Sequence, residues 1–454
     1  MRVRALPFAS LALLLAVSST AGAAARAEPE RRGDHGATSP PAPVALSPVD
    51  STVEGSLPQV AFDSRGDAFA VWQEGRANGI FTRAAVKPAG GNWGPARTLA
   101  RGGYVSLAVD ARGDAVVAGL TLAARQGVFA VYRPTGGEWS RAVLVSGSGG
   151  AADVVQATAI DPEGRAFVTW ATASSQAADN RVEVSVRRRG HWSTHVVGHG
   201  AGPAIAVAEN GDALLVWHTP PGGDGRFLAS WNMHGQGWQR PRPIPLATGT
   251  PVRPEQPQLI LGRNGDATVF WTNWGAGVFS SSAPSGGSFG PAQNLQIGYD
   301  SLQAGATVAP DGAAALAAVA NRGNGPLELR IRGSATAAWG APVVLGQSAL
   351  QSALALDRSG RLIVAWVESD GAPPDYGDLL LELATGTSAG HVSASRTLAR
   401  IGGDCWMHRC THGGDPAVAI GPDGQAIVAW VAKTDPYKGA GGVVMAQSLR
   451  LPAR

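Results

Sequence analysis

Residues 106–119 read SLAVDARGDAVVAG, and two related stretches read PQVAFDSRGDAFAVW (58–72) and SALALDRSGRLIVAW (352–366). Each stretch alternates apolar with other residues, passes through a short turn, and alternates again. Alternation with period two is typical of β-strands. The turn contains Asp, which bonds its own backbone, and Gly, which accepts a positive φ. Each stretch is therefore predicted to be a β-hairpin, whose strands we call A and B.

This hairpin recurs eight times, and each copy is counted here as one repeat. The turn glycines are Gly66, Gly113, Gly164, Gly211, Gly265, Gly312, Gly360 and Gly424. An aspartate stands three residues before the glycine in four repeats, as Asp63, Asp110, Asp161 and Asp357. Tryptophan ends the B strand in six repeats, as Trp72, Trp170, Trp217, Trp271, Trp366 and Trp430. We expect these residues to be scaffold, because each repeat must stack on its neighbours to bury a core.

A second hairpin, with strands C and D, follows in most repeats, as in GIFTRAAVKPAGGNWGPARTLA (79–100). Its glycine-rich turn is followed by an aromatic residue: Trp93, Trp139, Trp192, Trp238, Phe289 or Trp339. Four strands in a repeat of about 40–50 residues are the signature of a β-propeller blade. The sequence therefore predicts an all-β fold, an eight-bladed β-propeller of four-stranded antiparallel blades.

The two ends of the repeat array complement each other. The eighth repeat shows strands A, B and C but no D strand, whereas PAPVALSP (41–48) resembles a D strand without a blade of its own. We predict that residues 43–47 complete the last blade. This pairing would close the ring and remove an exposed sheet edge.

The N-terminus has the layout of a secretory signal peptide. Arg2 and Arg4 precede an apolar run over residues 6–17, and small residues follow, with cleavage expected after Ala23 or Ala27. The alternative is an uncleaved anchor, although the run is short for a membrane span. The predicted organisation is a signal peptide (1–27), a disordered polar linker (28–42) and one β-propeller domain (43–454).

The charge of the exported chain is balanced. The whole chain carries 37 Lys+Arg and 34 Asp+Glu, but Arg2, Arg4 and Arg26 fall within the predicted signal peptide. A neutral protein has no general electrostatic attraction to nucleic acid or anionic lipid. We expect no nucleic-acid partner, no membrane insertion, no cofactor and no metal, and a monomer.

The hairpins resemble known propeller repeats. AVDARGDAVVA (108–118) is similar to NHL-type repeats, and the Gly-Gly-x-Trp turns resemble the sialidase-like, Asp-box group of secreted propellers. The resemblance covers nearly all of residues 43–454 and implies the fold. It carries no activity over, because the sialidase Arg-Ile-Pro motif is absent and the Asp-box spacing differs.

Function is expected where the repeat pattern varies. The A–B and C–D turns are short and share one face, whereas the B–C and D–A loops vary and share the other. Three enlarged loops converge there: VESDGAPPDYGD (367–378), IGGDCWMHRCTHGGD (401–415) and AKTDPYKGAGG (432–442). The predicted ligand-binding residues are Trp406, Tyr376, His408, Glu368, Asp370, Asp435, Tyr437 and Trp274.

These residues favour a secreted binding module that recognises a carbohydrate or protein ligand through its B–C/D–A face. The alternative is a glycan-acting hydrolase or lyase, with Glu368 and Asp370 as the candidate acid and base. Ordinary solvated loops would have the same composition. Without a recognisable catalytic set, binding is the favoured hypothesis.

Cys405 and Cys410 are the two cysteines of the chain. An exported protein favours a disulfide between them. The alternatives are a zinc site that includes His408 and His412, or free thiols. Three further histidines stand at positions 191, 195 and 199. The repeat alignment puts His191 at a C–D turn and His195 in strand D, and at the spacing of an extended strand residues four apart are too distant to share one ion.

Overall fold

The computed structural model describes residues 41–49, 54–121, 127–146, 151–173, 179–220, 225–246, 257–273, 277–297, 304–308, 312–319, 325–334, 337–369, 379–402, 405–406, 409–410, 414–433 and 442–452. Nearly all regular structure in these ranges is β-strand, with a short 3₁₀ turn, η2, at Met233–Gly235. No helix within them is long and apolar enough to span a bilayer.

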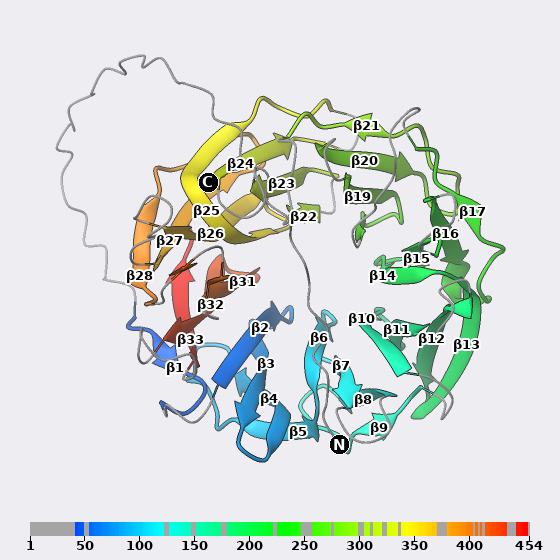
Figure 1. Cartoon of the computed structure of the whole chain (residues 1–454), viewed down its shortest axis with the longest axis horizontal. Coiled ribbons are helices and arrows are strands. Elements are labelled where there is room, and N and C mark those ends of the chain that lie inside the picture. Colours follow the sequence, from blue (N-terminus) through cyan, green and yellow to red (C-terminus); the bar gives the residue numbers. More distant parts are fainter. Residues whose placement is uncertain are drawn as a thin grey trace. The chain divides into compact units, whose positions relative to one another are not determined.

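The first five repeats each form one four-stranded antiparallel sheet (Figure 1). Their strands are β2 (Glu54–Phe62), β3 (Ala68–Arg76), β4 (Gly79–Lys87) and β5 (Arg97–Arg101); β6 (Gly103–Val109), β7 (Ala115–Thr121), β8 (Gly127–Arg133) and β9 (Val143–Leu144); β10 (Ala151–Ile160), β11 (Ala166–Ala173), β12 (Arg181–Arg188) and β13 (His191–His199); β14 (Ala201–Val207), β15 (Ala213–His218), β16 (Phe227–Asn232) and β17 (Arg242–Pro243); β18 (Gln258–Leu261), β19 (Ala267–Asn273), β20 (Gly277–Ala283) and β21 (Gln293–Asn294). Each sheet runs in the order A, B, C, D, as predicted.

The sixth and seventh repeats share a single seven-stranded sheet. Its strands are β22 (Ala304–Val308), β23 (Ala314–Val319), β24 (Gly325–Arg332), β25 (Val343–Leu356), β26 (Arg361–Ser369), β27 (Leu379–Thr387) and β28 (Arg396–Arg400). The long strand β25 pairs with β24 through residues 343–349 and with β26 through residues 349–356. It therefore serves as the D strand of one repeat and the A strand of the next.

The number of blades differs from the prediction. With the last sheet, which contains β31 (Gly414–Ile420), β32 (Gln425–Lys433), β33 (Gly442–Arg450) and β1 (Val44–Ala45), the described residues form a propeller of seven sheets. Eight separate blades are therefore wrong, because β25 joins two repeats without a break. The A strands contact one another in the closed series β2, β6, β10, β14, β18, β22, β25, β31 and β2 again, around the centre of the ring (Figure 1).

The predicted closure of the ring is confirmed. Strand β1 pairs with β33 through Val44 opposite Ala446 and Ala45 opposite Met445. The pairing continues beyond β1, where the Leu46 N–H donates to the Val444 carbonyl at 2.8 Å and the Val444 N–H donates to Ser47 Oγ at 2.9 Å. An N-terminal strand thus completes the sheet formed by the last repeat.

The A–B turns have the predicted geometry. All eight turn glycines have φ between 74° and 96°. In the second repeat, Asp110 Oδ1 accepts the N–H groups of Arg112, Gly113 and Asp114, each at 2.9 Å. A Cβ on Gly113 would also lie 2.5 Å from Oδ2 of Asp63 in the preceding repeat. Glycine at this position therefore adopts the positive φ of the turn and also allows the neighbouring repeat to approach closely.

The core lies between adjacent sheets rather than within one. The six B-strand tryptophans are buried, and each packs in a cluster of apolar side chains from two neighbouring repeats. The aromatic residues of the C–D turns cover the same interfaces; Trp139, for example, packs near Val71 and Ala84 of the preceding repeat. Both predicted sets of aromatic residues are therefore scaffold.

Two truncations test the closure. Deleting residues 28–48 should lower the melting temperature by several degrees, because it removes β1 and the buried Leu46 and exposes the edge of β33. Deleting residues 28–40 should leave the melting temperature unchanged, because Pro41, whose carbonyl accepts from Gln447 Nε2, remains. Equal melting temperatures for both truncations would contradict the closure.

Two alanine substitutions separate backbone strain from crowding in the turns. Gly90 has a φ of 68°, and a Cβ added there would meet no atom within 4 Å, so Gly90→Ala should cost only left-handed strain, about 1 kcal/mol. Gly113→Ala should cost about 3 kcal/mol, because the Asp63 carboxylate must also move. Urea denaturation of both variants measures the difference; equal costs would argue against the inter-repeat contact.

Candidate functional site

Most of the predicted ligand-binding residues lie outside the described residues: Trp274, Asp370, Tyr376, His408, Asp435 and Tyr437. The backbone of Trp406 lies in β29 (Cys405–Trp406), which pairs with β30 (Arg409–Cys410). Glu368 lies in β26. The convergence of the three enlarged loops therefore stays a prediction.

The backbone register of β29 and β30 places Cys405 directly opposite Cys410. Opposed residues of an antiparallel pair have Cα atoms roughly 4.5–5.5 Å apart, within the range that a disulfide bridges. The backbone positions of the two cysteines are thus compatible with a disulfide, which stays a prediction. His412 of the alternative zinc set lies outside the described residues, as His408 does.

His195 lies in a D strand, as expected, and His191, which the alignment put at the C–D turn, begins the same strand. The three histidines at positions 191, 195 and 199 all belong to β13, and their side chains are exposed. Their opposite residues in β12 are Arg188, Val184 and Arg181. The spacing along an extended strand separates successive histidines by about 13 Å, so they do not form one ligand set.

The Glu368 side chain is hydrogen-bonded within the fold through both carboxylate oxygens. Its Oε1 accepts the N–H groups of Gln347 and Ser348 at 2.8 and 2.9 Å, and its Oε2 accepts Nε1–H of Trp366 at 2.6 Å. A Cβ on Gly346 would lie 2.1 Å from Oε2, so glycine is required there. These contacts lie where β25 leaves β24 and begins to pair with β26. The carboxylate therefore holds the junction that joins the sixth and seventh repeats.

A feature that sequence reasoning missed lies at the start of the A strands. Strands β2, β6, β14 and β31 each contain a shift in register against their B strand. The first residue within each shift has a left-handed backbone: Leu57 (φ 50°), Tyr104 (φ 53°), Gly202 (φ 59°) and Asp415 (φ 43°). Three of these are not glycine, and bulky residues rarely adopt this conformation. We call these positions the inner-strand bulges.

Hydrogen bonds link the bulges of neighbouring repeats. Gln351 Oε1 accepts the Asp415 N–H at 2.7 Å, and its Nε2 donates to Asp415 Oδ1 at 3.2 Å. Asp415 Oδ2 in turn accepts the Leu57 N–H at 3.3 Å. Gln73 Oε1 accepts the Tyr104 N–H at 2.9 Å. Side chains of one repeat thus hold the strained backbone of the next, from the seventh repeat through to the second.

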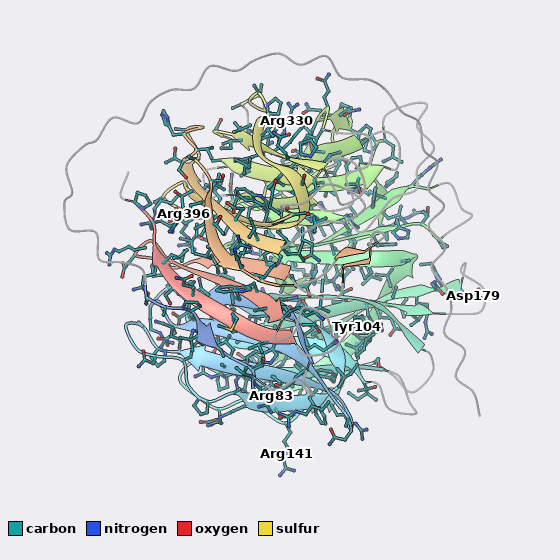
Figure 2. All side chains as sticks on the ribbon, turned by 60° about the vertical axis from the view of Figure 1, so that its left-hand side comes forward. Arg83, Tyr104, Arg141, Asp179, Arg330 and Arg396 are labelled. Atoms are coloured by element: carbon teal, nitrogen blue, oxygen red, sulfur yellow. The ribbon has the colours of Figure 1, made fainter. Side chains whose placement is uncertain are left out.

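Two bulge residues expose apolar side chains. Leu57 is 39% and Tyr104 43% exposed. The bulges lie where the D–A connections enter the inner strands, so they belong to the face predicted to bind ligand. Tyr104 lies toward the middle of the view in Figure 2, whereas Arg141 and Asp179 project from the periphery. We call the end of the ring that carries Leu57, Tyr104 and Asp415 the bulge face.

The sequence carries a faint signal for the bulges. A glycine stands two residues before each bulge residue, at positions 55, 102, 200 and 413. In three of the four repeats a proline directly follows the bulge residue, at positions 58, 203 and 416. Proline in sheets is confined to edges and bulges. This signal is not part of the period-two alternation, which explains why the pattern alone does not reveal it.

The opposite end, formed by the A–B turns, is bridged by charges. Arg263 Nε of the fifth repeat lies 3.0 Å from Glu209 Oε2 of the fourth, and Arg358 of the seventh repeat also pairs with Glu209. The two arginines are about 70% exposed (72% and 68%). One carboxylate thus connects three A–B turns from different parts of the ring.

Comparison with known proteins identifies the fold. No protein-family model matches the chain, and no curated protein matches it in sequence. A similar solved structure is the BP39L lectin from Burkholderia pseudomallei, with a TM-score of 0.51, 14% identity, and coverage of 76% of this chain and 100% of the lectin.

Two further solved structures are more distant. An α-L-arabinofuranosidase from Fusarium graminearum has a TM-score of 0.43 at 10% identity, covering 90% of this chain and 98% of that chain. A protein of unknown function from Dyadobacter fermentans has a TM-score of 0.46 at 11% identity, covering 90% and 98%. At 14% identity the likeness to the lectin is one of fold alone.

A substitution at Glu368 tests its structural role. Glu368→Gln keeps the size but leaves one oxygen to accept three donors, so it should destabilise the protein by about 1–3 kcal/mol. Glu138→Gln, on an exposed side chain, should change stability by less than about 0.5 kcal/mol. Urea denaturation compares the two; an unchanged Glu368 variant would leave the carboxylate free for another role.

Proposed function

We propose that this protein is an exported β-propeller that binds carbohydrate through its bulge face. The observation that carries the proposal is Tyr104, an exposed ring on a left-handed backbone. That conformation costs roughly 1–2 kcal/mol for a residue with a side chain. Strain of this kind clusters at ligand-binding sites. A glycine would relieve it, as Gly202 does at the equivalent position of the fourth repeat.

The chemistry of the bulge face suits a sugar. An exposed tyrosine offers a flat apolar ring with a polar tip, and Leu57 adds apolar surface in the neighbouring repeat. The Asp415 carboxylate and the Gln73 amide are held in fixed positions by their hydrogen bonds. A few fixed polar groups beside apolar surface are typical of small-ligand sites. The BP39L lectin, whose fold this chain shares, is by its name a carbohydrate-binding protein.

Binding is favoured over hydrolysis for a specific reason. Both oxygens of Glu368, the described member of the candidate acid–base pair, accept hydrogen bonds from the fold. A carboxylate that holds a strand junction is poorly suited to donate a proton to a leaving group. The predicted aromatic residues Trp406 and Tyr376 would extend the bulge face, and a protein ligand remains the other partner class.

Export is part of the proposal. It is supported by the signal-peptide layout of residues 1–27 and by Cys405 standing opposite Cys410. In an oxidising compartment the two cysteines would form a disulfide.

A glycan array probed with residues 28–454 tests the function. Tyr104→Ala should weaken the strongest glycan signal at least tenfold, because aromatic anchors dominate binding energy. Leu144→Ala, which removes an equally exposed side chain from the outer strand β9, should leave it unchanged. Tyr104→Gly should also lose binding, yet raise stability by about 0.5–1 kcal/mol, because the strain is relieved.

The outcomes discriminate between the hypotheses. Normal glycan binding by the folded Tyr104→Ala protein would show that the bulge face is the wrong site. No glycan signal from the wild-type protein would contradict carbohydrate recognition. Release of sugar from a glycosidase substrate panel, lost in Glu368→Gln, would support the hydrolase instead.

A further inference from the structure

In six repeats the aromatic residue of the C–D turn packs against the preceding sheet. These residues are Trp93 on the last sheet, Trp139 on the first, Trp192 on the second, Trp238 on the third, Phe289 on the fourth and Trp339 on the fifth. An aromatic ring between neighbouring repeats is thus a regular part of this fold.

The junction between the seventh and eighth repeats departs from this rule. Because β1 supplies the fourth strand of the last sheet, β33 leads to Leu451 and Pro452, and the described residues contain no C–D turn there. Trp430 of the eighth repeat packs against the seventh, as the other B-strand tryptophans do. The additional C–D-turn aromatic that covers the other junctions is absent here among the described residues.

The turn of the seventh repeat also lacks an aromatic residue. The Ser393 N–H donates to the Thr385 carbonyl at 2.8 Å, just as the Gly94 N–H donates to the Val86 carbonyl at 2.9 Å in the first repeat. This correspondence aligns Val392 with Trp93. The seventh repeat thus carries a smaller side chain where six others carry a ring. Val392 packs against the cluster between the sixth and seventh repeats and also lines the hollow described next.

A hollow of about 250 Å³ lies at this junction. Leu362, Val392, Leu451 and Pro452 give it a mostly apolar lining, and Arg361 and His391 are its charged or titratable members. Arg361 is held in place, because its Nε donates to Asp357 Oδ2 at 2.6 Å and its Nη2 donates to the Pro422 carbonyl at 3.1 Å. The hollow lies at the turn end of the sheets, at the opposite end of the strands from the bulge face.

We propose that this hollow binds a single indole-sized aromatic ring. Apolar cavities of proteins bind small aromatic molecules when no side chain fills them. Here the fold itself supplies a template, because five of the six C–D-turn aromatics are tryptophans. The fixed guanidinium of Arg361 adds a cation that favours the π face of a ring. The site is independent of the carbohydrate-binding proposal and requires neither Tyr104 nor the predicted loops.

Titration with free indole, followed by calorimetry or ligand-observed NMR, tests the proposal. We expect a Kd of roughly 0.1–1 mM, as for a small ligand in a ring-sized pocket. Pro452→Trp, which supplies a ring from the eighth repeat at the lining of the hollow, should fill it and weaken indole binding at least tenfold. Val196→Trp, which places tryptophan at an exposed position of β13, should leave it unchanged.

A peptide arm identifies the source of the ring. The peptide Gly-Gly-Asn-Trp-Gly, which reproduces residues 90–94 of this chain, presents tryptophan on a turn sequence. If this peptide competes with indole and the same peptide with Ala in place of Trp does not, the ring is supported as an aromatic side chain of a partner polypeptide. Binding of indole without the peptide would support a small-molecule ligand. No indole binding up to 10-fold above the expected Kd (about 10 mM), or equal binding by Pro452→Trp, would overturn the proposal.

Discussion

Each sheet of this protein buries its two faces only against neighbouring sheets, and this constraint governs the rest of the structure. The B-strand tryptophans lie in clusters shared by two repeats, so an end sheet without a neighbour would expose an apolar face. A closed ring is the arrangement in which no sheet is left at an end. The short pairing of β1 with β33 completes it and fixes the last sheet beside the first. The same topology removes the C–D turn from the last sheet and leaves a hollow beside it.

Most of the fold was predictable from local sequence patterns. Period-two alternation and turn glycines are properties of single hairpins, and the positive φ of Gly360 or Gly424 follows from the turn alone. The N-terminal strand was predictable because a closed ring needs a partner for an unpaired strand. The number of sheets was not, because it depends on β25 running without a break from its pairing with β24 into its pairing with β26. Alternation looks the same whether one strand ends or continues into the next sheet.

For the candidate site, the sequence predicted only which end of the ring carries it, not which residues form it. Sequence reasoning assigned variable loops to one end of the ring, but it followed the chemically rich loops of the last two repeats. The bulges are formed by ordinary residues such as Leu57 and Tyr104, whose unusual feature is a backbone angle. The N–H groups of these two residues are hydrogen-bonded to Gln73 and Asp415 of neighbouring repeats, contacts that no local pattern reveals. The two ends of the ring therefore differ in physical character: one carries strained backbone and exposed apolar side chains, and the other carries tight turns linked by ion pairs.

The closure of the ring also orders events during synthesis. Ser47 contacts Val444, 397 residues further along the chain. A ribosome releases β1 well before β33, so β1 must wait for the 397 residues that separate Ser47 from Val444 before it can pair. Contacts between adjacent repeats form locally and early, whereas a contact of this separation carries a large loop-closure entropy and forms late. Until then the nascent ring is open, and the edge of its last sheet is available to other strands.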